Sequence, residues 1–256
     1  MIMQKRDNWS EEELIIVFNL YCKLSFGQYN HTNKRVIELS KILGRTSSAV
    51  AFKLGNFARL DPVHQKRGVK GWQHGSKLDE KIWNEFNQNW EELAYQSEIA
   101  VNKLKGQKLF DLIKDEKEIP EGKTKEAIVK VRVNQGFFRE MILASYRSRC
   151  SLCSLPEANL LVAGHIVPWS MDVSLRMNPR NGICMCVLHD KAFDRGLITI
   201  SDDYKIVLSK AIKRIADEPA IERGFITYEG REIKLPDKFM PEKEYLGIHR
   251  SKIFNA

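Results

Sequence analysis

Long apolar runs are absent from this sequence: no stretch approaches the ~18 consecutive apolar residues that a membrane-spanning helix needs. The first residues, Met1 to Asp7, also lack the apolar core of a secretory signal, and there are no internal repeats or low-complexity tracts. These absences predict a soluble, cytoplasmic protein without a membrane partner. Wholesale disorder is excluded too, because 43% of the 256 residues are hydrophobic. This length suggests one large domain or two smaller ones.

Cysteine is scarce and odd in number, with five residues spread along the chain. Without a secretory signal, this pattern argues against a disulfide framework and leaves metal ligation or buried thiols. The 41 Lys and Arg residues exceed the 33 Asp and Glu residues, which gives a formal net charge of +8. Clustered cations release counterions from phosphates, so a basic balance hints at a polyanionic partner. Many basic proteins bind no nucleic acid, and the distribution of the charge matters more than its size.

Three helices are expected in the first 60 residues. Ser10 and three following carboxylates predict the start of the first helix, a second is expected over Arg35–Leu43, and a third follows Thr46. Gly44 ends the second helix, so the second and third form a helix-turn-helix pattern. The early Trp, acidic first helix and "GRTSSAV" segment resemble the Myb-like pattern. Any small three-helix bundle would give the same spacing.

The same region holds the strongest local charge. Between Lys34 and Gly75, nine basic residues face two acidic ones, for a net charge of +7. The basic residues are Lys34, Arg35, Lys41, Arg45, Lys53, Arg59, Lys66, Arg67 and Lys70. One interpretation is a solvated helical face with a lysine-rich loop. The other, which we favour here, is contact with double-stranded DNA.

A composition shift divides the chain. Residues 77–113 continue the helical pattern with packed Trp residues, and the charged residues 114–127, with Pro120 and Gly122, predict a linker. We therefore expect a helical DNA-reading domain at 1–113 and a second domain at 128–256. The second domain is expected to open with a strand over Val129–Val133 and to contain hairpins over 197–208 and 225–235.

Three blocks in the second domain, "GHIVPWS", "NPRNG" and "LHDKAFDRGLI", contain His165, Asn181 and His189. An apolar strand ending in His, an Asn-Gly turn, a second strand and a His-bearing helix form a ββα pattern. The blocks resemble the HNH endonuclease family, whose fold is the ββα-metal finger, and especially its restriction-endonuclease subgroup. The resemblance covers residues 129–200. It implies a C-terminal ββα-metal nuclease domain. With the helix-turn-helix-like domain expected from the N-terminal helices, the predicted fold class is α+β.

The resemblance also implies roles for these residues. His165 corresponds to the general base, Asn181 steadies the loop that orients it, and His189 is a metal ligand. These residue types suit the chemistry, because phosphodiester hydrolysis needs a base for water and a divalent ion, here Mg²⁺ or Mn²⁺, to neutralise developing charge. For each residue alone, a buried and satisfied polar side chain is the ordinary alternative.

One position departs from the family pattern. Many members place an Asp or His immediately before the base as a second metal ligand, but this chain has Gly164. The ion must then use His189 with another group, for which Asp190 and Asp194 are candidates. Alternatively, Asp194 caps or orients its own helix, and the ion is held mainly by His189, water and substrate.

Two further groups accompany the motif. Arg180 and Arg195 flank it and either clamp the phosphate or lie on the surface beside a turn. Two Cys pairs also resemble the four-Cys structural zinc of some HNH proteins. Buried thiols explain these Cys residues equally well. The residues of the possible structural zinc site are Cys150, Cys153, Cys184 and Cys186.

Together these features predict a metal-dependent DNA endonuclease of restriction type, possible as a homodimer because cutting both strands often uses two active sites. The alternatives are a modification-dependent restriction enzyme that reads a modified base, and a catalytically degenerate DNA-binding regulator, which Gly164 favours. An RNA substrate is a further alternative.

Overall fold

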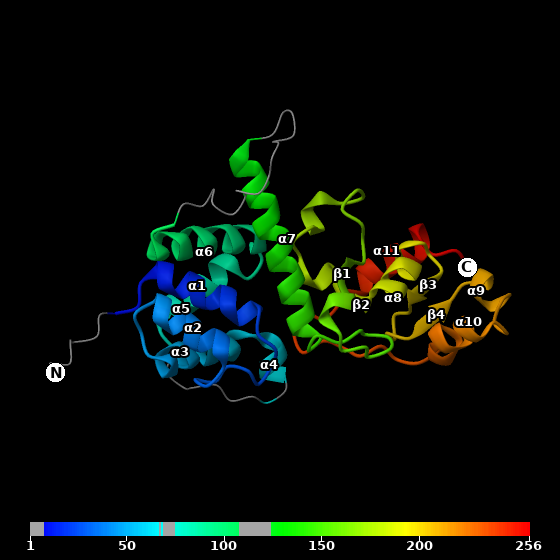
Figure 1. Ribbon diagram of the computed structural model, residues 1–256, viewed down its shortest axis with the longest axis horizontal. Coiled ribbons are helices and arrows are strands. Elements are labelled where there is room, and N and C mark those ends of the chain that lie inside the picture. Colours follow the sequence, from blue (N-terminus) through cyan, green and yellow to red (C-terminus); the bar gives the residue numbers. More distant parts are fainter. Residues whose placement is uncertain (1–7, 67, 69–74, 108–123) are drawn as a thin grey trace. The chain divides into compact units, whose positions relative to one another are not determined.

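The computed structural model describes residues 8–66, 68, 75–107 and 124–256 (Figure 1). The chain divides into two compact units, residues 1–137 and 138–256. Helices build the first unit, and helices with short antiparallel strands build the second, which confirms the α+β class. The domain limits at 113 and 128 remain predictions, and residues 114–123 of the expected linker lie outside the described residues.

The first unit contains the three helices expected from the sequence. Ser10 and Glu13 form a capping box at the start of the first, and the Thr46 side chain caps the third. Gly44 has a φ of +62° in the turn before it, a conformation that glycine adopts without steric cost. The helices of this unit are α1 (Glu11–Cys22), α2 (Lys34–Ile42), α3 (Ser47–Leu60), α4 (Pro62–Lys66), α5 (Lys77–Phe86), α6 (Trp90–Lys105) and the first part of α7 (Lys125–Ser145).

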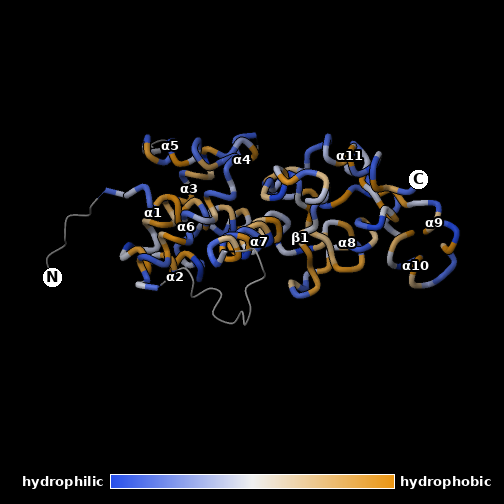
Figure 2. Tube along the Cα trace, turned by 90° about the horizontal axis from the view of Figure 1, so that it is seen from above, coloured by the Kyte–Doolittle hydropathy of each residue, from blue (hydrophilic) through white to orange (hydrophobic). Residues whose placement is uncertain are grey.

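Aromatic side chains form the core of this unit. Phe18 of α1 is fully buried, and its ring centroid lies 4.8 Å from that of Phe57 and 5.2 Å from that of Trp83. These partners come from α3 and α5, so α1 is the helix on which the bundle packs. Figure 2 shows the apolar (orange) positions along these helices. The burial of Trp83 and Trp90 agrees with the expected packing role of the Trp residues.

The strand expected over Val129–Val133 is wrong, because these residues lie in helix α7. Alternating β-branched residues imitate a strand pattern, but Val129 is fully buried while Val131 is 44% exposed. Further along α7, Phe137, Phe138, Met141 and Ile142 are buried, a spacing of three to four residues that fits one helical face. The longer helical period therefore decides the local structure.

The second unit combines two small sheets with helices. Its elements are the end of α7, η2 (Ala158–Leu160), β1 (Leu161–His165), η3 (Val173–Leu175), η4 (Pro179–Asn181), β2 (Gly182–Cys186), α8 (Val187–Asp194), β3 (Ile198–Ile200), β4 (Ile206–Leu208), α9 (Lys210–Lys213), α10 (Pro219–Gly224), η5 (Ile226–Tyr228) and α11 (Lys243–Lys252). β3 and β4 pair antiparallel, which confirms the first expected hairpin. The second is wrong: that segment holds η5, and Glu232 forms an isolated bridge to Lys205.

The strands β1 and β2 pair antiparallel, with His165 opposite Gly182, and α8 begins directly after β2. This is the ββα arrangement that the motif spacing predicts. A Cβ on Gly182 would lie 2.3 Å from Ile142 of α7, so only glycine allows this close packing beside His165. Within the described segments, no helix has the length and apolar character needed to cross a membrane.

Candidate active site and metal centre

His165 stands at the end of β1. Its Nε2 lies 2.9 Å from the backbone oxygen of Arg176, and because a carbonyl can only accept, Nε2 carries the proton. In the neutral ring, Nδ1 then holds the lone pair. The ring stacks on Phe138, with 4.3 Å between centroids, and Trp169 meets it edge-on at 5.9 Å. His165 is thus a fixed imidazole whose Nδ1 can accept a proton.

The surroundings of His165 favour its neutral form. Burial lowers the pKa of His165 below its ordinary value, and the guanidinium charge of Arg176 acts in the same direction. The hydrogen bond to the Arg176 carbonyl and the charge of Asp194 act the other way. A histidine that is neutral at physiological pH is in the state that a general base needs.

Asn181 fixes the backbone that follows His165. Its Oδ1 accepts a hydrogen bond from the N–H of Val167 at 2.8 Å, and its Nδ2 donates to the Val167 carbonyl at 2.9 Å. The carbonyl oxygen of Asn181 accepts the N–H of Ile166 at 2.9 Å. The side chain is fully buried, so these bonds also satisfy its polar atoms. The base is therefore carried on a backbone that Asn181 holds in place.

Asp190 on α8 directs its carboxylate against the backbone of Gly164, the residue before His165. A Cβ atom on Gly164 would stand 2.4 Å from Oδ1 of Asp190, which is too close for any real contact. The same Oδ1 is buried and has no hydrogen-bond partner among the described residues. The carboxylate of Asp190 therefore fills the space that the absent side chain of Gly164 leaves.

Asp194 lies four residues after Asp190, on the same face of α8. Burial, together with the charge of Asp194, raises the pKa of Asp190 to about 6. Burial also raises the pKa of Asp194, and the nearby positive charges of Lys191 and Arg195 oppose this shift. Two neighbouring carboxylates, one with an unpartnered buried oxygen, fit a hard divalent cation such as Mg²⁺ or Mn²⁺.

Arg176 is a site residue that the sequence pattern does not single out. Its carbonyl holds His165, its guanidinium lies 5.0 Å from the ring centroid of Trp169, and its Nε is buried without a hydrogen-bond partner in the described part of the chain. Its neighbour Arg180, a predicted phosphate ligand, instead pairs with Glu242 at 3.0 Å. Arg195 follows α8 with an exposed side chain. The hydrogen bond from His165 to the Arg176 carbonyl places Arg176 at the site. Sequence spacing gives no sign of this contact.

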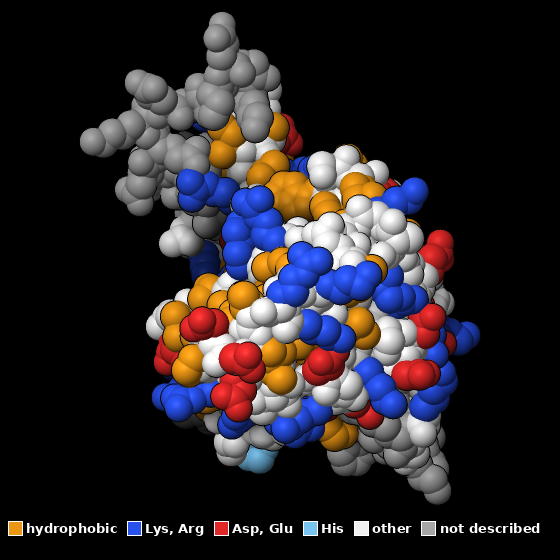
Figure 3. Space-filling view, turned by 90° about the vertical axis from the view of Figure 1, so that its right-hand side faces the viewer, with side chains coloured by type: hydrophobic (Ala, Val, Ile, Leu, Met, Phe, Trp, Pro, Cys, Tyr) orange, Lys and Arg blue, Asp and Glu red, His pale blue; other side chains and the backbone are white. Residues whose placement is uncertain are grey.

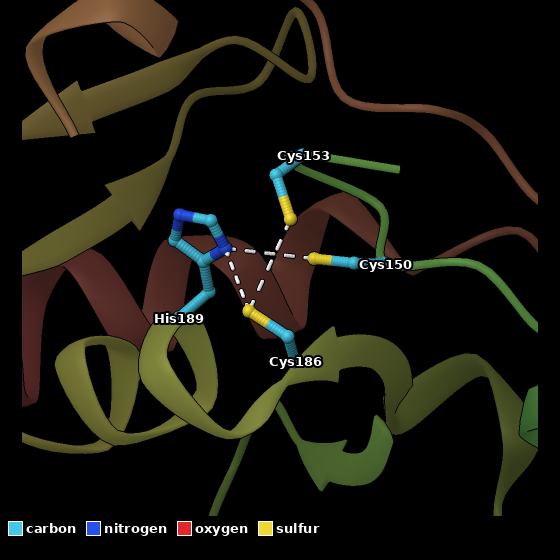
Figure 4. Close-up of side chains that lie close together, drawn as sticks. All are labelled: Cys150, Cys153, Cys186 and His189. Carbon is cyan, nitrogen blue, oxygen red and sulfur yellow. Dashed lines mark hydrogen bonds between the residues drawn. The ribbon is translucent and has the colours of Figure 1, made fainter. Parts of the chain in front are cut away.

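His189 does not join His165. It faces three cysteines, and the donor atoms of all four residues lie within 4.8 Å of one another (Figure 4). Nδ1 of His189 is 3.1 Å from Sγ of Cys186 and 3.5 Å from Sγ of Cys150. The Sγ atoms of Cys153 and Cys186 are 4.0 Å apart. Within the described residues this is the one group of His, Cys, Asp and Glu with such close donor atoms.

The expected four-cysteine set is therefore wrong in one member. Cys184 pairs with Ala163 inside the β1–β2 sheet and is fully buried, and burial raises the pKa of its thiol to about 12. Cys186 is the last residue of β2 and directly precedes α8, whereas Cys184 lies inside the strand. The first turn of α8 brings His189 to the cluster instead.

The cluster also favours a thiolate. The hydrogen bond with Cys186 lowers the pKa of Cys150 to about 3 against the opposing effect of burial, and the hydrogen bond with His189 adds to the lowering. The same contact with Cys150 raises the pKa of Cys186. Three cysteine sulfurs and an imidazole are a suitable set of donors for a soft or borderline metal.

Several of the predicted DNA-binding residues have other partners. Lys53 is only 7% exposed and its Nζ lies 2.8 Å from Asp79, so the expectation that it contacts DNA is not met. Arg45 binds both carboxylate oxygens of Glu13, at 2.5 and 2.7 Å, and lies over the ring of Trp9. Lys53 therefore joins α3 to α5, and Arg45 joins the turn between α2 and α3 to α1.

The remaining basic residues of this stretch differ in exposure. Arg59 pairs with Glu80 at 3.0 Å, and Arg35 donates to the backbone oxygen of Lys23. Lys34 and Lys66 have exposed side chains, whereas Arg67 and Lys70 lie outside the described residues. Figure 3 shows further Lys and Arg side chains across the end of the molecule that holds α9 and α10. Exposed basic residues of these helices and their linker are Lys210, Lys213, Arg214 and Arg223.

The comparisons with known proteins agree with the ββα geometry. The family model for HNH endonucleases matches residues 150–201, a segment that begins at Cys150 and includes β1, β2 and α8. No curated protein matches the chain. The matched segment contains His165, Asn181 and His189 in the order that the motif blocks predict. Residues 150–201 therefore match the HNH endonuclease family.

Proposed function

We propose that this protein is a metal-dependent DNA endonuclease of restriction type in which His165 is the general base. The observation that carries the proposal is the fixed ring of His165, whose Nε2 donates to a carbonyl and whose Nδ1 holds the lone pair. The carboxylates of Asp190 and Asp194 lie on the helix beside it. A base and an acidic pair at the end of a ββα unit provide what phosphodiester hydrolysis needs.

In the proposed reaction, Nδ1 of His165 takes a proton from a water molecule as the water oxygen attacks the phosphorus. The bond between phosphorus and the 3′ oxygen breaks, and the leaving oxygen acquires a proton from solvent. The products are a 5′-phosphate and a 3′-hydroxyl. Phe138 and the Arg176 carbonyl keep the ring of His165 in one orientation, so little reorganisation precedes proton transfer.

Asp190 and Asp194 would hold the catalytic cation. When bound, the cation supplies positive charge to the phosphate and the leaving oxygen. Apart from this, Asp190 contributes an oxygen with no competing hydrogen-bond partner in the described residues, so binding a cation does not break an existing contact. The pKa of Asp190, raised to about 6, leaves this carboxyl largely ionised at neutral pH.

Arg176 completes the proposed site as the residue that contacts the substrate phosphate. A guanidinium can give a phosphate two parallel hydrogen bonds, and the Nε of Arg176 has no hydrogen-bond partner in the described residues. Trp169 supports the guanidinium from one side. Arg180, in contrast, already pairs with Glu242, so phosphate binding there would compete with an ion pair.

The restriction role and the DNA-reading role extend the proposal to the whole chain. The helices α2 and α3 with their short turn support DNA recognition by the first unit, and exposed residues such as Lys34 and Lys66 supply positive charge. Such an enzyme acts in the cytoplasm, where its DNA lies. We also propose a homodimer, since two active sites can cut both strands.

Incubation with supercoiled plasmid in the presence of Mg²⁺, Mn²⁺ or EDTA tests the activity. We expect metal-dependent nicking or linearisation, and no cleavage in EDTA. His165→Ala should lower the cleavage rate by about 10²–10⁴-fold while DNA binding, measured by gel shift, is retained. Cleavage at the wild-type rate in this variant would refute the role of His165. Binding without cleavage by the wild-type protein in every metal would favour the catalytically degenerate regulator.

Digestion of genomic DNAs with different base modifications tests the restriction type. Selective cleavage of modified DNA would assign the protein to modification-dependent restriction, and equal cleavage of all DNAs would remove the need for a modified base. Sequencing the ends of the fragments then gives the recognition site and the cut pattern.

A further inference from the structure

The four residues Cys150, Cys153, Cys186 and His189 have the spacing of a tetrahedral metal site. With Zn–S bonds near 2.3 Å and Zn–N bonds near 2.1 Å, tetrahedral geometry gives about 3.8 Å between two sulfurs and about 3.6 Å between sulfur and nitrogen. The distances here are 4.0 Å between the sulfurs of Cys153 and Cys186, and 3.1 and 3.5 Å from Nδ1 of His189 to two sulfurs. These three distances differ from the tetrahedral values by no more than about 0.5 Å, and all four donor atoms lie within 4.8 Å of one another.

The orientation of His189 is independent support. Its Nε2 lies 2.8 Å from the carbonyl oxygen of Gly224, so Nε2 carries the proton and Nδ1 presents its lone pair to the three sulfurs. A metal-binding His commonly donates its other ring N–H to such a carbonyl, which fixes the tautomer and the ring. The ring is 2% exposed and lies edge-on to Phe225 and Tyr228. Both nitrogens of His189 thus have defined roles away from His165.

We propose that these four residues bind a structural zinc ion and that His189 is a ligand of this zinc rather than of the catalytic cation. Three thiolates and an imidazole select zinc over Mg²⁺ or Mn²⁺, which prefer oxygen donors. The part of the inference that concerns the catalytic cation rests on the proposed nuclease function. The zinc site itself stands on the geometry alone.

The local structure explains how the chain makes this site. Cys150 and Cys153 lie in one turn, in which the N–H of Ser154 donates to the Cys150 carbonyl at 2.9 Å and Ser154 has a φ of +67°. Cys186 is the residue before α8, and His189 follows three positions later on its first turn. A bound zinc would therefore join the turn after α7 to the start of α8.

This connection has a consequence for the active site. Asp190 directly follows His189 on α8, and its carboxylate lies against Gly164. Fixing His189 by zinc fixes the rotation of α8, and the rotation of α8 determines where the Asp190 carboxylate lies. The sites are thus separate in their ligands but linked by one helix, with His189 on the zinc side and Asp190 on the catalytic side.

Metal analysis of the purified full-length protein after dialysis against EDTA tests the zinc site without any cleavage assay. We expect one zinc per chain, released when a mercurial reagent blocks the thiols and measured with a chromogenic chelator. Cys186→Ala should lose the zinc, whereas the matched control Cys184→Ala should keep it. Protein without zinc after growth in zinc-supplemented medium, or equal loss of zinc in both variants, would overturn the site.

His189→Cys separates the two possible roles of His189 and guards against variants that fail to fold. If His189 is a zinc ligand, the variant supplies a fourth thiolate, keeps one zinc per chain and loses less cleavage activity than Asp190→Asn. Asp190→Asn should retain the zinc and cut at least about 100-fold more slowly. A different result would overturn this assignment: His189→Cys retains zinc, no longer responds to added Mg²⁺ or Mn²⁺, and cleaves as slowly as Asp190→Asn. His189 would then be a ligand of the catalytic cation.

Failure of the nuclease proposal gives a different result. In that case the wild-type protein would not cut DNA, but its zinc content and the contrast between the two cysteine variants would be unchanged. Zinc content therefore reports on the Cys and His cluster, and cleavage reports on His165 and the carboxylates.

Discussion

A methyl group on Gly164 should displace the carboxylate of Asp190. The Cβ of an alanine would stand 2.4 Å from Oδ1, and ordinary contact begins at 3.4 Å, so the two atoms must separate by about 1 Å. The strand cannot easily move, because Gly164 pairs with Ile183 within the β1–β2 sheet. The Asp190 side chain must therefore yield. Met185, whose Cε would be 3.2 Å away, is flexible enough to adapt.

The expected cost follows from this displacement. A shift of about 1 Å in a catalytic constellation can lower the rate about 100-fold, and overpacking of this kind costs about 1–3 kcal/mol of stability. We therefore expect Gly164→Ala to remain folded in urea denaturation and to cleave plasmid DNA about 100-fold more slowly in single-turnover assays with Mg²⁺. Gly136→Ala is the matched control: a Cβ there meets nothing within 4 Å, and alanine favours the α7 helix.

A double-mutant cycle gives the sharper test. If Gly164→Ala acts only by moving the carboxylate, adding it to Asp190→Asn should slow cleavage little further, because the same group has already been removed. Two independent effects would multiply instead. Wild-type cleavage by Gly164→Ala, or a double variant far slower than Asp190→Asn alone, would refute the idea that this glycine makes room for a catalytic carboxylate.

Four further predictions concern charge. Arg176→Ala should lower kcat/KM by about 10–100-fold, more than Arg180→Ala does, which steady-state cleavage of an oligonucleotide duplex measures. Burial lowers the pKa of His249 from its ordinary value of 6.5 to about 4. The neutral His249 therefore contributes its full stabilisation above pH 6.5, and this contribution is lost as the pH falls toward 4, because the unfolded chain takes up the proton first. Roughly 3 kcal/mol of unfolding free energy is at stake, and His249→Gln should flatten this part of the pH profile of urea denaturation. Lys53→Ala should destabilise the first unit by about 3–5 kcal/mol, since it leaves a buried carboxylate unpaired. Lys34→Ala should leave stability unchanged within about 0.5 kcal/mol and weaken DNA binding in gel shifts.

Local signals were sufficient to predict much of the fold. The caps at Ser10 and Thr46 and the helical spacing of apolar residues act within a few positions, so α1 and α3 follow from the sequence. The ββα unit follows from motif order for a similar reason: only the short helices η3 and η4 separate β1 from β2, and α8 follows β2 directly. The expected strand at Val129–Val133 fails because a local alternation competes with a longer helical period.

Charge counting fails for a different reason. Lys53 belongs to the +7 stretch in the sequence, but its partner Asp79 lies 26 residues further along, outside the counted window. Net charge in a segment says nothing about pairing between helices, and a cation buried by such a pair cannot reach a phosphate. The useful positive surface is therefore smaller than the sequence indicates, and exposed residues such as Lys34 and Lys66 carry more of it.

The assignment of His189 and Asp190 required three dimensions because they are consecutive residues. Sequence spacing places both within the same motif, but successive residues on a helix point about 100° apart, and only the packing of α8 decides which faces the cysteines. The contact of His189 Nε2 with Gly224 and the contact of Asp190 with Gly164 together fix that rotation. A glycine before the base then no longer indicates a degenerate site on its own. Gly164 provides the space into which Asp190 of α8 can direct an oxygen ligand. His189, the residue before Asp190, faces the cysteines instead.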